Sequence, residues 1–121
     1  MLLIDAANVI GSRPNGWWRD RAGAANDFVQ RVRLAARSGQ LPGPAVVVLE
    51  GAARRGVEEG FADGVRVLHA PRSGDDALLR LATETADRPV LVSADRALGR
   101  RIEEVGGDVV GPRWLLDRLE A

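Results

Sequence analysis

Residues 2–8 have the sequence LLIDAAN, and this short stretch decides the fold. Three apolar residues in a row lead directly into Asp5, and Asn8 follows within one helical turn. A continuous apolar run of this kind is typical of a strand that is buried on both faces of a parallel sheet. Because ligands bind beyond the carboxyl ends of the strands in such sheets, Asp5 is the first candidate for a functional residue.

Four further apolar runs share this character, and segments with helical periodicity separate them. We predict strands at residues 2–4, 45–49, 65–68, 89–92 and 108–110. Apolar residues spaced three and four apart predict helices over residues 21–37, from residue 75, over residues 98–105 and from Pro112, with a weak helix over residues 52–63. The alternation predicts a three-layer α/β/α fold around a mainly parallel sheet.

The composition narrows the range of functions. The chain has 121 residues, of which 45% are hydrophobic, so we expect residues 1–121 to form a single domain. It has no cysteine, and all 17 of its basic residues are arginine, which excludes disulfides, thiolate metal sites, Walker A loops and Schiff-base catalysis. Equal numbers of acidic and basic residues argue against an indiscriminate nucleic-acid coat. No export signal or membrane span is evident, so we expect a cytoplasmic protein without membrane contact.

Acidic side chains lie where the predicted strands and helices meet. Asp5 ends the first strand, Asp75 and Asp76 begin the helix that precedes the fourth strand, and Asp95 lies just beyond that strand. If the first and fourth strands are neighbours, these carboxylates converge and repel one another. Mg²⁺ or Mn²⁺ would relieve the repulsion, because both ions prefer oxygen ligands, and either would activate a water molecule for phosphodiester cleavage.

Helix capping is the alternative explanation for most of these residues. Ser73 and Asp76 have the spacing of a capping box, and Ser93 with Asp95 fits an N-cap followed by an acidic first turn. The sequence leaves both explanations open at these positions. Capping is the weaker explanation for Asp5, which has no helix start to cap unless Asn8 begins one.

The irregular stretch at residues 11–20 contains two adjacent tryptophans, Trp17 and Trp18. Three arginines flank them, namely Arg13, Arg19 and Arg21. The rings would stack on bases and the arginines would contact phosphates, or else the loop forms a lid that packs on the core.

Other polar residues at strand ends are less specific. Glu50 follows the second strand and would join the acidic cluster or remain exposed. His69 is the only histidine, and we favour a structural or solvent role for it. Arg72 and Arg96 would neutralise the acids, and Arg96 is also a candidate for substrate binding together with Ser93.

Three motifs resemble the PIN-like superfamily of metal-dependent ribonucleases, and in particular its NYN branch of the YacP-like type. LLIDAANVIG at residues 2–11 is similar to the family's strand-Asp-x-x-Asn opening. SGDDAL at residues 73–78 is similar to its acidic helix start, with Asp76 the better aligned carboxylate. VLVSADRAL at residues 90–98 is similar to its Ser/Thr-x-Asp strand exit.

The resemblance implies a five-stranded sheet in the order 3-2-1-4-5, which places the first and fourth strands side by side. It also implies that Asp5, Asp76 and Asp95 bind Mg²⁺ or Mn²⁺, with Asn8 and Ser93 supporting them. Two departures concern Ala97, where the family often has a further acid, and Ser73, where it often has lysine.

The expected function is therefore a metal-dependent endoribonuclease, with RNA as the partner in a form such as tRNA or the ribosome. Two alternatives stay open on the sequence alone. One is a PIN-like module that binds RNA, a ribosome or a protein without cleaving. The other is a hydrolase of nucleotides or other small phosphate esters. The sequence does not determine the oligomeric state.

Overall fold

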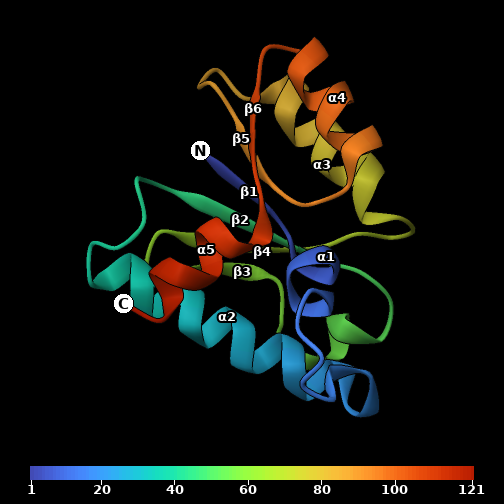
Figure 1. Cartoon of the computed structure of the whole chain (residues 1–121), viewed down its shortest axis with the longest axis vertical. Coiled ribbons are helices and arrows are strands. Elements are labelled where there is room, and N and C mark those ends of the chain that lie inside the picture. Colours follow the sequence, from blue (N-terminus) through green and yellow to red (C-terminus); the bar gives the residue numbers. More distant parts are fainter.

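The computed structural model describes residues 1–121 and contains one six-stranded sheet in the order β3-β4-β2-β1-β5-β6 (Figure 1). All neighbouring strands are parallel except β3 and β4, which are antiparallel. The strands are β1 (Leu2–Asp5), β2 (Ala45–Leu49), β3 (Gly60–Ala62), β4 (Val65–His69), β5 (Val90–Val92) and β6 (Asp108–Val110).

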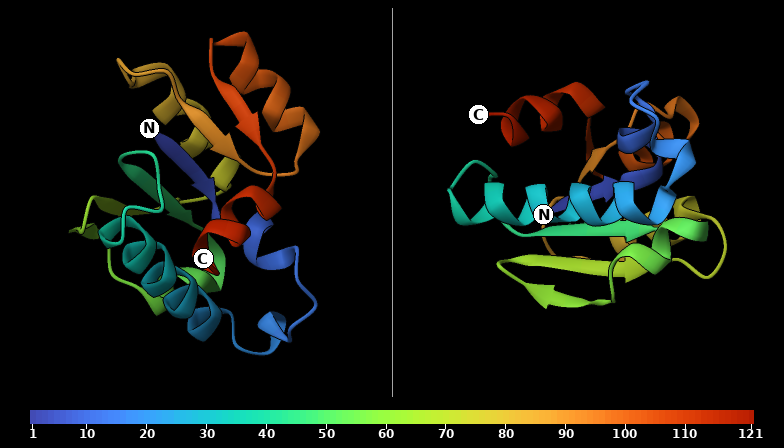
Figure 2. Two further views of the ribbon diagram at one scale, coloured as in Figure 1. Left: turned by 60° about the vertical axis from the view of Figure 1, so that its left-hand side comes forward. Right: turned by 90° about the horizontal axis from the view of Figure 1, so that it is seen from below.

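Helices cover both faces of the sheet, as the sequence predicts. They are α1 (Ala6–Gly11), α2 (Arg21–Arg37), α3 (Gly74–Glu84), α4 (Arg96–Glu104) and α5 (Pro112–Leu119), with short 3₁₀ helices at Trp17–Arg19 and Gly51–Gly56. Figure 1 shows α3 and α4 side by side, and Figure 2 shows α2 and α5 apart from them. None of the helices is both long and apolar enough to cross a membrane.

Two apolar clusters form the core, one on each face. Leu2 and Ile4 of β1 pack with α1, α2 and α5, whereas Leu3 packs with α3 and α4. Successive strand residues point to opposite faces, so a strand that is apolar throughout buries side chains in both layers. This explains why the core strands have continuous rather than alternating apolar runs.

The five parallel strands have the predicted order. If β1, β2, β4, β5 and β6 are numbered 1 to 5 along the chain, their order across the sheet is 3-2-1-4-5. The sixth strand is an addition that the sequence analysis missed, and the weak helix predicted over residues 52–63 is wrong. This segment instead forms the 3₁₀ helix Gly51–Gly56 and the edge strand β3, which is joined to β4 by a turn with positive φ at Asp63 and Gly64. All three residues of β3 are exposed, so no apolar pattern marked the strand.

Candidate active site

The strand order β2-β1-β5 brings together three strand ends that are far apart in sequence. Glu50 follows β2, Asp5 ends β1, and Ser93 follows β5. The start of α3, with Asp75, lies on the same side, since the backbone N–H of Gly74 donates to Glu50, and the charges of Asp75 and Glu50 both raise the pKa of Asp5. The predicted convergence of acidic residues at this edge of the sheet is therefore present in the structure.

Asp5 is the most buried acid in the cluster, with only 7% of its surface exposed. Its Oδ1 accepts the Asn8 backbone N–H at 3.3 Å, and its Oδ2 accepts the Ser93 hydroxyl at 2.9 Å. Burial raises the pKa of Asp5 the most, and the two hydrogen bonds oppose that effect because they stabilise the charged form. Asp5 is also the N-cap of the short helix α1, which begins at Ala6, so capping, which the sequence analysis considered the weaker explanation for Asp5, is present in the structure.

A polar network ties the exits of β1 and β5 together. Ser93 Oγ, which donates to Asp5, also accepts the Asp95 backbone N–H at 3.1 Å. Asn8 Oδ1 accepts the Ala94 N–H at 2.7 Å. Residues on two different strand exits are thus held in one arrangement, as expected of supporting groups around a site.

Asp95 has a structural role as well as a place near the acids. Its Oδ1 accepts the Leu98 N–H at 3.1 Å and caps α4. Its charge is nevertheless close enough to raise the pKa of Asp75. Capping and membership of the acidic cluster, which the sequence presented as alternatives, coexist at this residue.

At the start of α3, Asp75 is the less exposed of the two adjacent acids. Asp75 is half-buried, and its pKa is raised first by burial and then by the charges of Asp95, Glu50 and Asp76. Asp76, which the sequence motif favours, is exposed to solvent. The expected capping box is absent, because Ser73 Oγ accepts the N–H of Asp75 at 3.1 Å.

Glu50 connects the acidic cluster to α3. Its Oε2 accepts the Gly74 backbone N–H at 2.8 Å, so the carboxylate binds the first turn of the helix that carries Asp75. The sequence placed Glu50 only at the periphery. Its position at the end of β2, directly beside β1 in the sheet, is the signal that would have given it more weight.

The donor chemistry of these residues suits Mg²⁺ or Mn²⁺. Asp5, Asp75, Asp95 and Glu50 offer only carboxylate oxygens; burial first, and neighbouring carboxylates after it, raise the pKa of Asp5 and of Asp75, and a bound cation would offset both effects. No group of three or more His, Asp or Glu side chains is arranged to hold a metal ion. Mg²⁺ is commonly held by one or two carboxylates together with waters and substrate phosphates, so the residues fit such a site.

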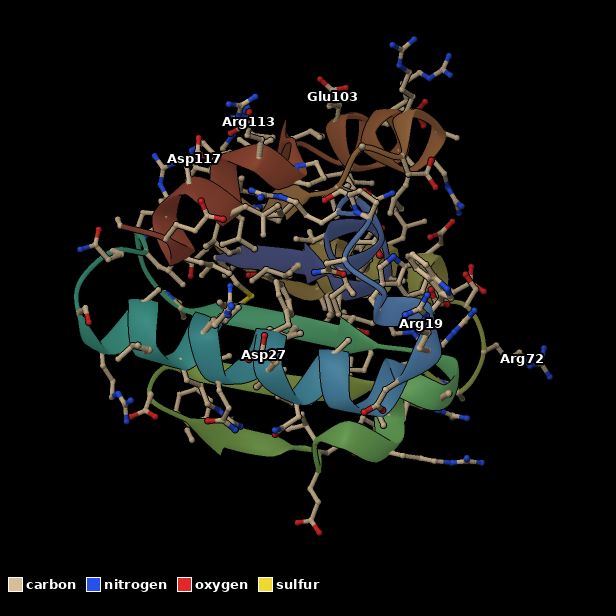
Figure 3. The ribbon with its side chains drawn as sticks, turned by 60° about the horizontal axis from the view of Figure 1, so that its bottom comes forward. Arg19, Asp27, Arg72, Glu103, Arg113 and Asp117 are labelled. Carbon is tan, nitrogen blue, oxygen red and sulfur yellow. The ribbon has the colours of Figure 1, made fainter.

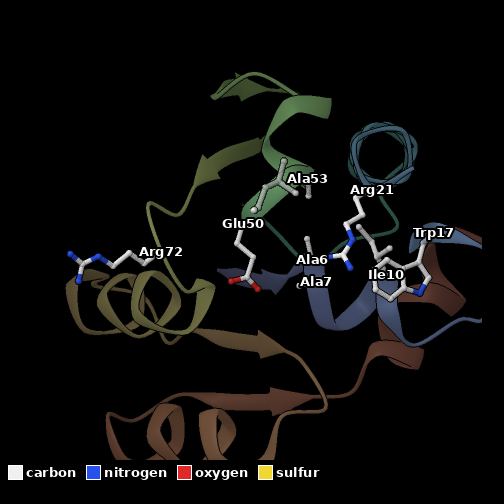
Figure 4. Close-up of a pocket in the computed structure, with 10 residues that line it drawn as sticks. Ala6, Ala7, Ile10, Trp17, Arg21, Glu50, Ala53 and Arg72 are labelled. Carbon is white, nitrogen blue, oxygen red and sulfur yellow. The ribbon is translucent and has the colours of Figure 1, made fainter. Parts of the chain in front are cut away.

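An open cavity of about 380 Å³ lies next to the acids (Figure 4). Glu50 lines one end and Trp17 the other, with Ala6 and Ala7 between them. The Arg21 guanidinium lies 5.3 Å from the centre of the Trp17 ring. Trp17 is half-buried, whereas Trp18 is 49% exposed and does not line the cavity.

The other predicted binding residues are spread over the surface. Arg13 pairs with Glu120 at 3.2 Å, and Arg19 lies 6.0 Å from the Trp18 ring. Figure 3 shows Arg19 and Arg72 near the same end of the molecule. Arg96 begins α4 and lines a separate hollow with Ser93 and Asp95. Arg13, Arg19 and Arg96 do not line the cavity, whereas Arg72 does.

His69 has the structural role that the sequence favoured. Its Nε2 lies 2.6 Å from the Val57 carbonyl oxygen, and its backbone N–H donates to Glu59. The ring thereby ties β4 to the segment that leads into β3.

Comparison with known proteins supports the fold. No family model and no curated protein sequence matches the chain. The crystal structure of Rae1 (YacP) from Bacillus subtilis is similar over 99% of this chain and 73% of that one, with a TM-score of 0.75 and 20% sequence identity. A tryptophan-to-leucine mutant of Rae1 is similar over 98% and 73% of the two chains, with a TM-score of 0.69 and 20% identity. The chain therefore has the fold of Rae1 (YacP), and its resemblance to the YacP-like type of PIN-like protein is confirmed at the level of the fold.

Proposed function

We propose that this chain is a divalent-metal-dependent endoribonuclease that hydrolyses RNA phosphodiester bonds. The observation that carries the proposal is the environment of Asp5, a buried carboxylate held by Ser93 and Asn8 among the charges of Asp75 and Glu50. Carboxylates are rarely buried among like charges without a cation, and pKa values perturbed in this way cluster at functional sites. The motif resemblance to metal-dependent ribonucleases supports the same reaction.

The side chains have distinct roles in this proposal. Asp5 would hold Mg²⁺ or Mn²⁺ with Asp75 or Asp95 as a second ligand and with waters and substrate phosphates as the others, and the ion would lower the pKa of a water molecule and offset phosphodiester charge. Ser93 fixes the orientation of Asp5 through its hydroxyl. Asn8 uses its Oδ1 to accept the Ala94 N–H, which leaves its amide NH₂ to donate to a phosphate oxygen.

A cleavage assay tests the proposal directly. Purified protein is incubated with end-labelled RNA in Mn²⁺, Mg²⁺ or EDTA, beside the variants Asp5→Asn and Asp95→Asn. We expect cleavage that needs the metal and is lost in both variants, while Asp117→Asn, an exposed carboxylate on α5, leaves it unchanged. Normal cleavage by both Asp5→Asn and Asp95→Asn would refute the mechanism.

The adjacent acids on α3 form a matched pair. Because Asp75 is half-buried and the charges of Asp95 and Glu50 raise its pKa, whereas the Asp76 side chain is exposed, Asp75→Asn is expected to impair cleavage more than Asp76→Asn. The opposite ranking would return the role to Asp76, as the motif alignment implies.

A non-cleaving module is the second candidate, and the absence of a three-ligand group favours it. The engagement of Asp95 Oδ1 in capping α4 points the same way. Under this alternative the chain binds RNA, in a form such as the ribosome or tRNA, in the cytoplasm. Calorimetric titration separates the two candidates: no Mg²⁺ or Mn²⁺ binding, with RNA binding retained, would favour the module.

A further inference from the structure

We infer that the cavity beside the acidic cluster binds one unpaired nucleobase of a single-stranded RNA. The inference rests on the proposed function and adds the way in which substrate is held. The cavity lies between α1, the 3₁₀ helix Trp17–Arg19, the start of α2 and the segment after β2 (Figure 4). Its volume of about 380 Å³ falls within the range of ~300–1,000 Å³ that is usual for small-molecule sites.

The cavity has the lining that a flat aromatic ligand needs. Ile10, Leu49 and Ala53 contribute apolar surface, and Trp17 contributes an aromatic ring at one end. The Trp18 ring stands edge-on to the Trp17 ring at 5.9 Å, and Gly11 lies so near the Trp17 ring that a Cβ there would contact it. These contacts restrict the Trp17 ring, and a base that stacks on the face under Arg21 would displace that guanidinium from its place 5.3 Å from the ring centre.

Positive charge lies where the phosphates of a bound strand would pass. Arg21 lines the cavity and extends over it toward Ala6 and Ala7, whereas Arg72 lies at the opposite rim and extends outward (Figure 4). Both are exposed, and neither takes part in any of the four ion pairs of the structure. Two arginines free of carboxylate partners on the rim of an apolar cavity complement a ligand with an aromatic base and an anionic backbone.

The cavity is continuous with the acidic cluster. Glu50 belongs to both, since it lines the cavity and its charge raises the pKa of Asp5. Ala6, which also lines the cavity, directly follows Asp5. A nucleotide with its base against Trp17 would therefore have its neighbouring phosphodiester next to the carboxylates.

This geometry selects single strands. A base within a duplex is stacked and paired on both sides, so it enters a cavity only after it has left the stack. An unpaired base does not carry that cost. We therefore expect single-stranded RNA to bind more tightly than the same sequence in a duplex.

Trp17 fluorescence provides a direct measurement of binding. The chain has three tryptophans and no tyrosine, so the double variant Trp18→Phe, Trp114→Phe leaves Trp17 as the only strong emitter. This protein is titrated in Ca²⁺, with gel analysis to confirm that the RNA remains intact. The ligands are a short single-stranded RNA, its blunt duplex, and an abasic ribose-phosphate chain of the same length. We expect strong quenching by the single strand and little by the other two.

Two variants in the otherwise native chain test the cavity itself, with binding followed by the anisotropy of labelled RNA. Trp17→Ala is expected to weaken binding by about 5- to 150-fold, the range that stacking of one base on an aromatic ring supplies. Ala7→Leu narrows the cavity at an exposed position of α1 without removing any core contact, and it should also weaken binding. Phe61→Ala, which removes an exposed aromatic ring on β3, is the control and should bind as the native chain does.

Several results would overturn the inference. These are equal binding of the abasic chain, normal binding by Ala7→Leu, or a loss in Trp18→Ala as large as that in Trp17→Ala. Cleavage of RNA with an unchanged KM in Trp17→Ala would reject the cavity and leave the nuclease intact. Binding in the cavity without cleavage of any RNA would reject the nuclease and leave the cavity.

Discussion

Replacing Asp5 with Asn is expected to stabilise the protein without metal and to remove its stabilisation by metal. Asp5 is buried, and the charges of Asp75 and Glu50 act on it, so its ionised form is disfavoured in the folded state. An Asn at this position can still accept the Asn8 N–H through its Oδ1 and can donate its NH₂ to Ser93 Oγ. The substitution therefore removes the unfavourable charge while it keeps the shape and most of the hydrogen bonding.

The sign of the pH dependence follows from the raised pKa of Asp5. The folded state holds the proton more tightly than the unfolded chain, whose Asp pKa is about 3.9. The destabilisation from the charged Asp5 is absent below that pH, grows as the pH rises toward the raised folded pKa, and is fully present above it. Removing one such unfavourable group typically gains about 0.5–2 kcal/mol, or roughly 2–8 °C in Tm for a chain of this size.

Metal acts in the opposite direction. An ion that binds only the folded state stabilises it by about 2.7 kcal/mol at 100 times its Kd. The native chain should therefore gain roughly 10 °C in saturating Mn²⁺ or Mg²⁺, whereas Asp5→Asn should gain little. The order of the two Tm values is expected to reverse between EDTA and metal.

Thermal unfolding followed by circular dichroism measures both effects, at pH 7 and near pH 4, in EDTA and across a metal titration. Asp117→Asn, at an exposed carboxylate, should follow the native chain throughout. A Tm for Asp5→Asn below the native value in EDTA at pH 7 would refute the charge argument. A full metal-induced rise in this variant would show that Asp5 is not a ligand.

Three smaller predictions concern the polar contacts. Ser93→Ala removes the hydroxyl that donates to Asp5. It should lower the free energy of unfolding, measured in urea, by about 1–3 kcal/mol and raise the pKa of Asp5 further. An unchanged free energy of unfolding would mean that water replaces the hydroxyl. Asn8→Ala leaves the Ala94 backbone N–H without its acceptor and should lower the free energy of unfolding by about 0.5–1.5 kcal/mol; an unchanged stability would contradict the role of this contact. Asp108→Asn breaks the exposed fork with Arg88 at 2.7 and 3.0 Å. Because that pairing lowers the pKa of Asp108, its small stabilisation should be present at neutral pH and should fade as the pH falls through the lowered pKa, or in high salt; a loss unaffected by salt would contradict it.

The central parallel strands could be predicted because they are apolar throughout, whereas their order was predicted from the resemblance to the PIN-like family. Ala45–Leu49, for example, is buried at every residue, and this burial is a direct consequence of its composition. The edge strand β3 could not be predicted in the same way, because Phe61 and its neighbours remain exposed and their pairing with β4 depends on backbone hydrogen bonds. The close packing of Gly56 against the Ala22 carbonyl was equally invisible, since it joins two segments that are distant in sequence.

The sequence by itself determined which carboxylates lie at the ends of strands, because hydrophobic periodicity is local and marks where each strand stops. It did not determine which carboxylates face one another. Successive residues on a helix are rotated by about 100°, so the choice between Asp75 and Asp76 depends on how α3 is turned against the sheet. Only the tertiary structure decides that rotation, by packing α3 on β1 and β2 and binding its first N–H to Glu50. The tertiary structure also places Trp17 and Glu50 on the lining of one cavity beside the acids.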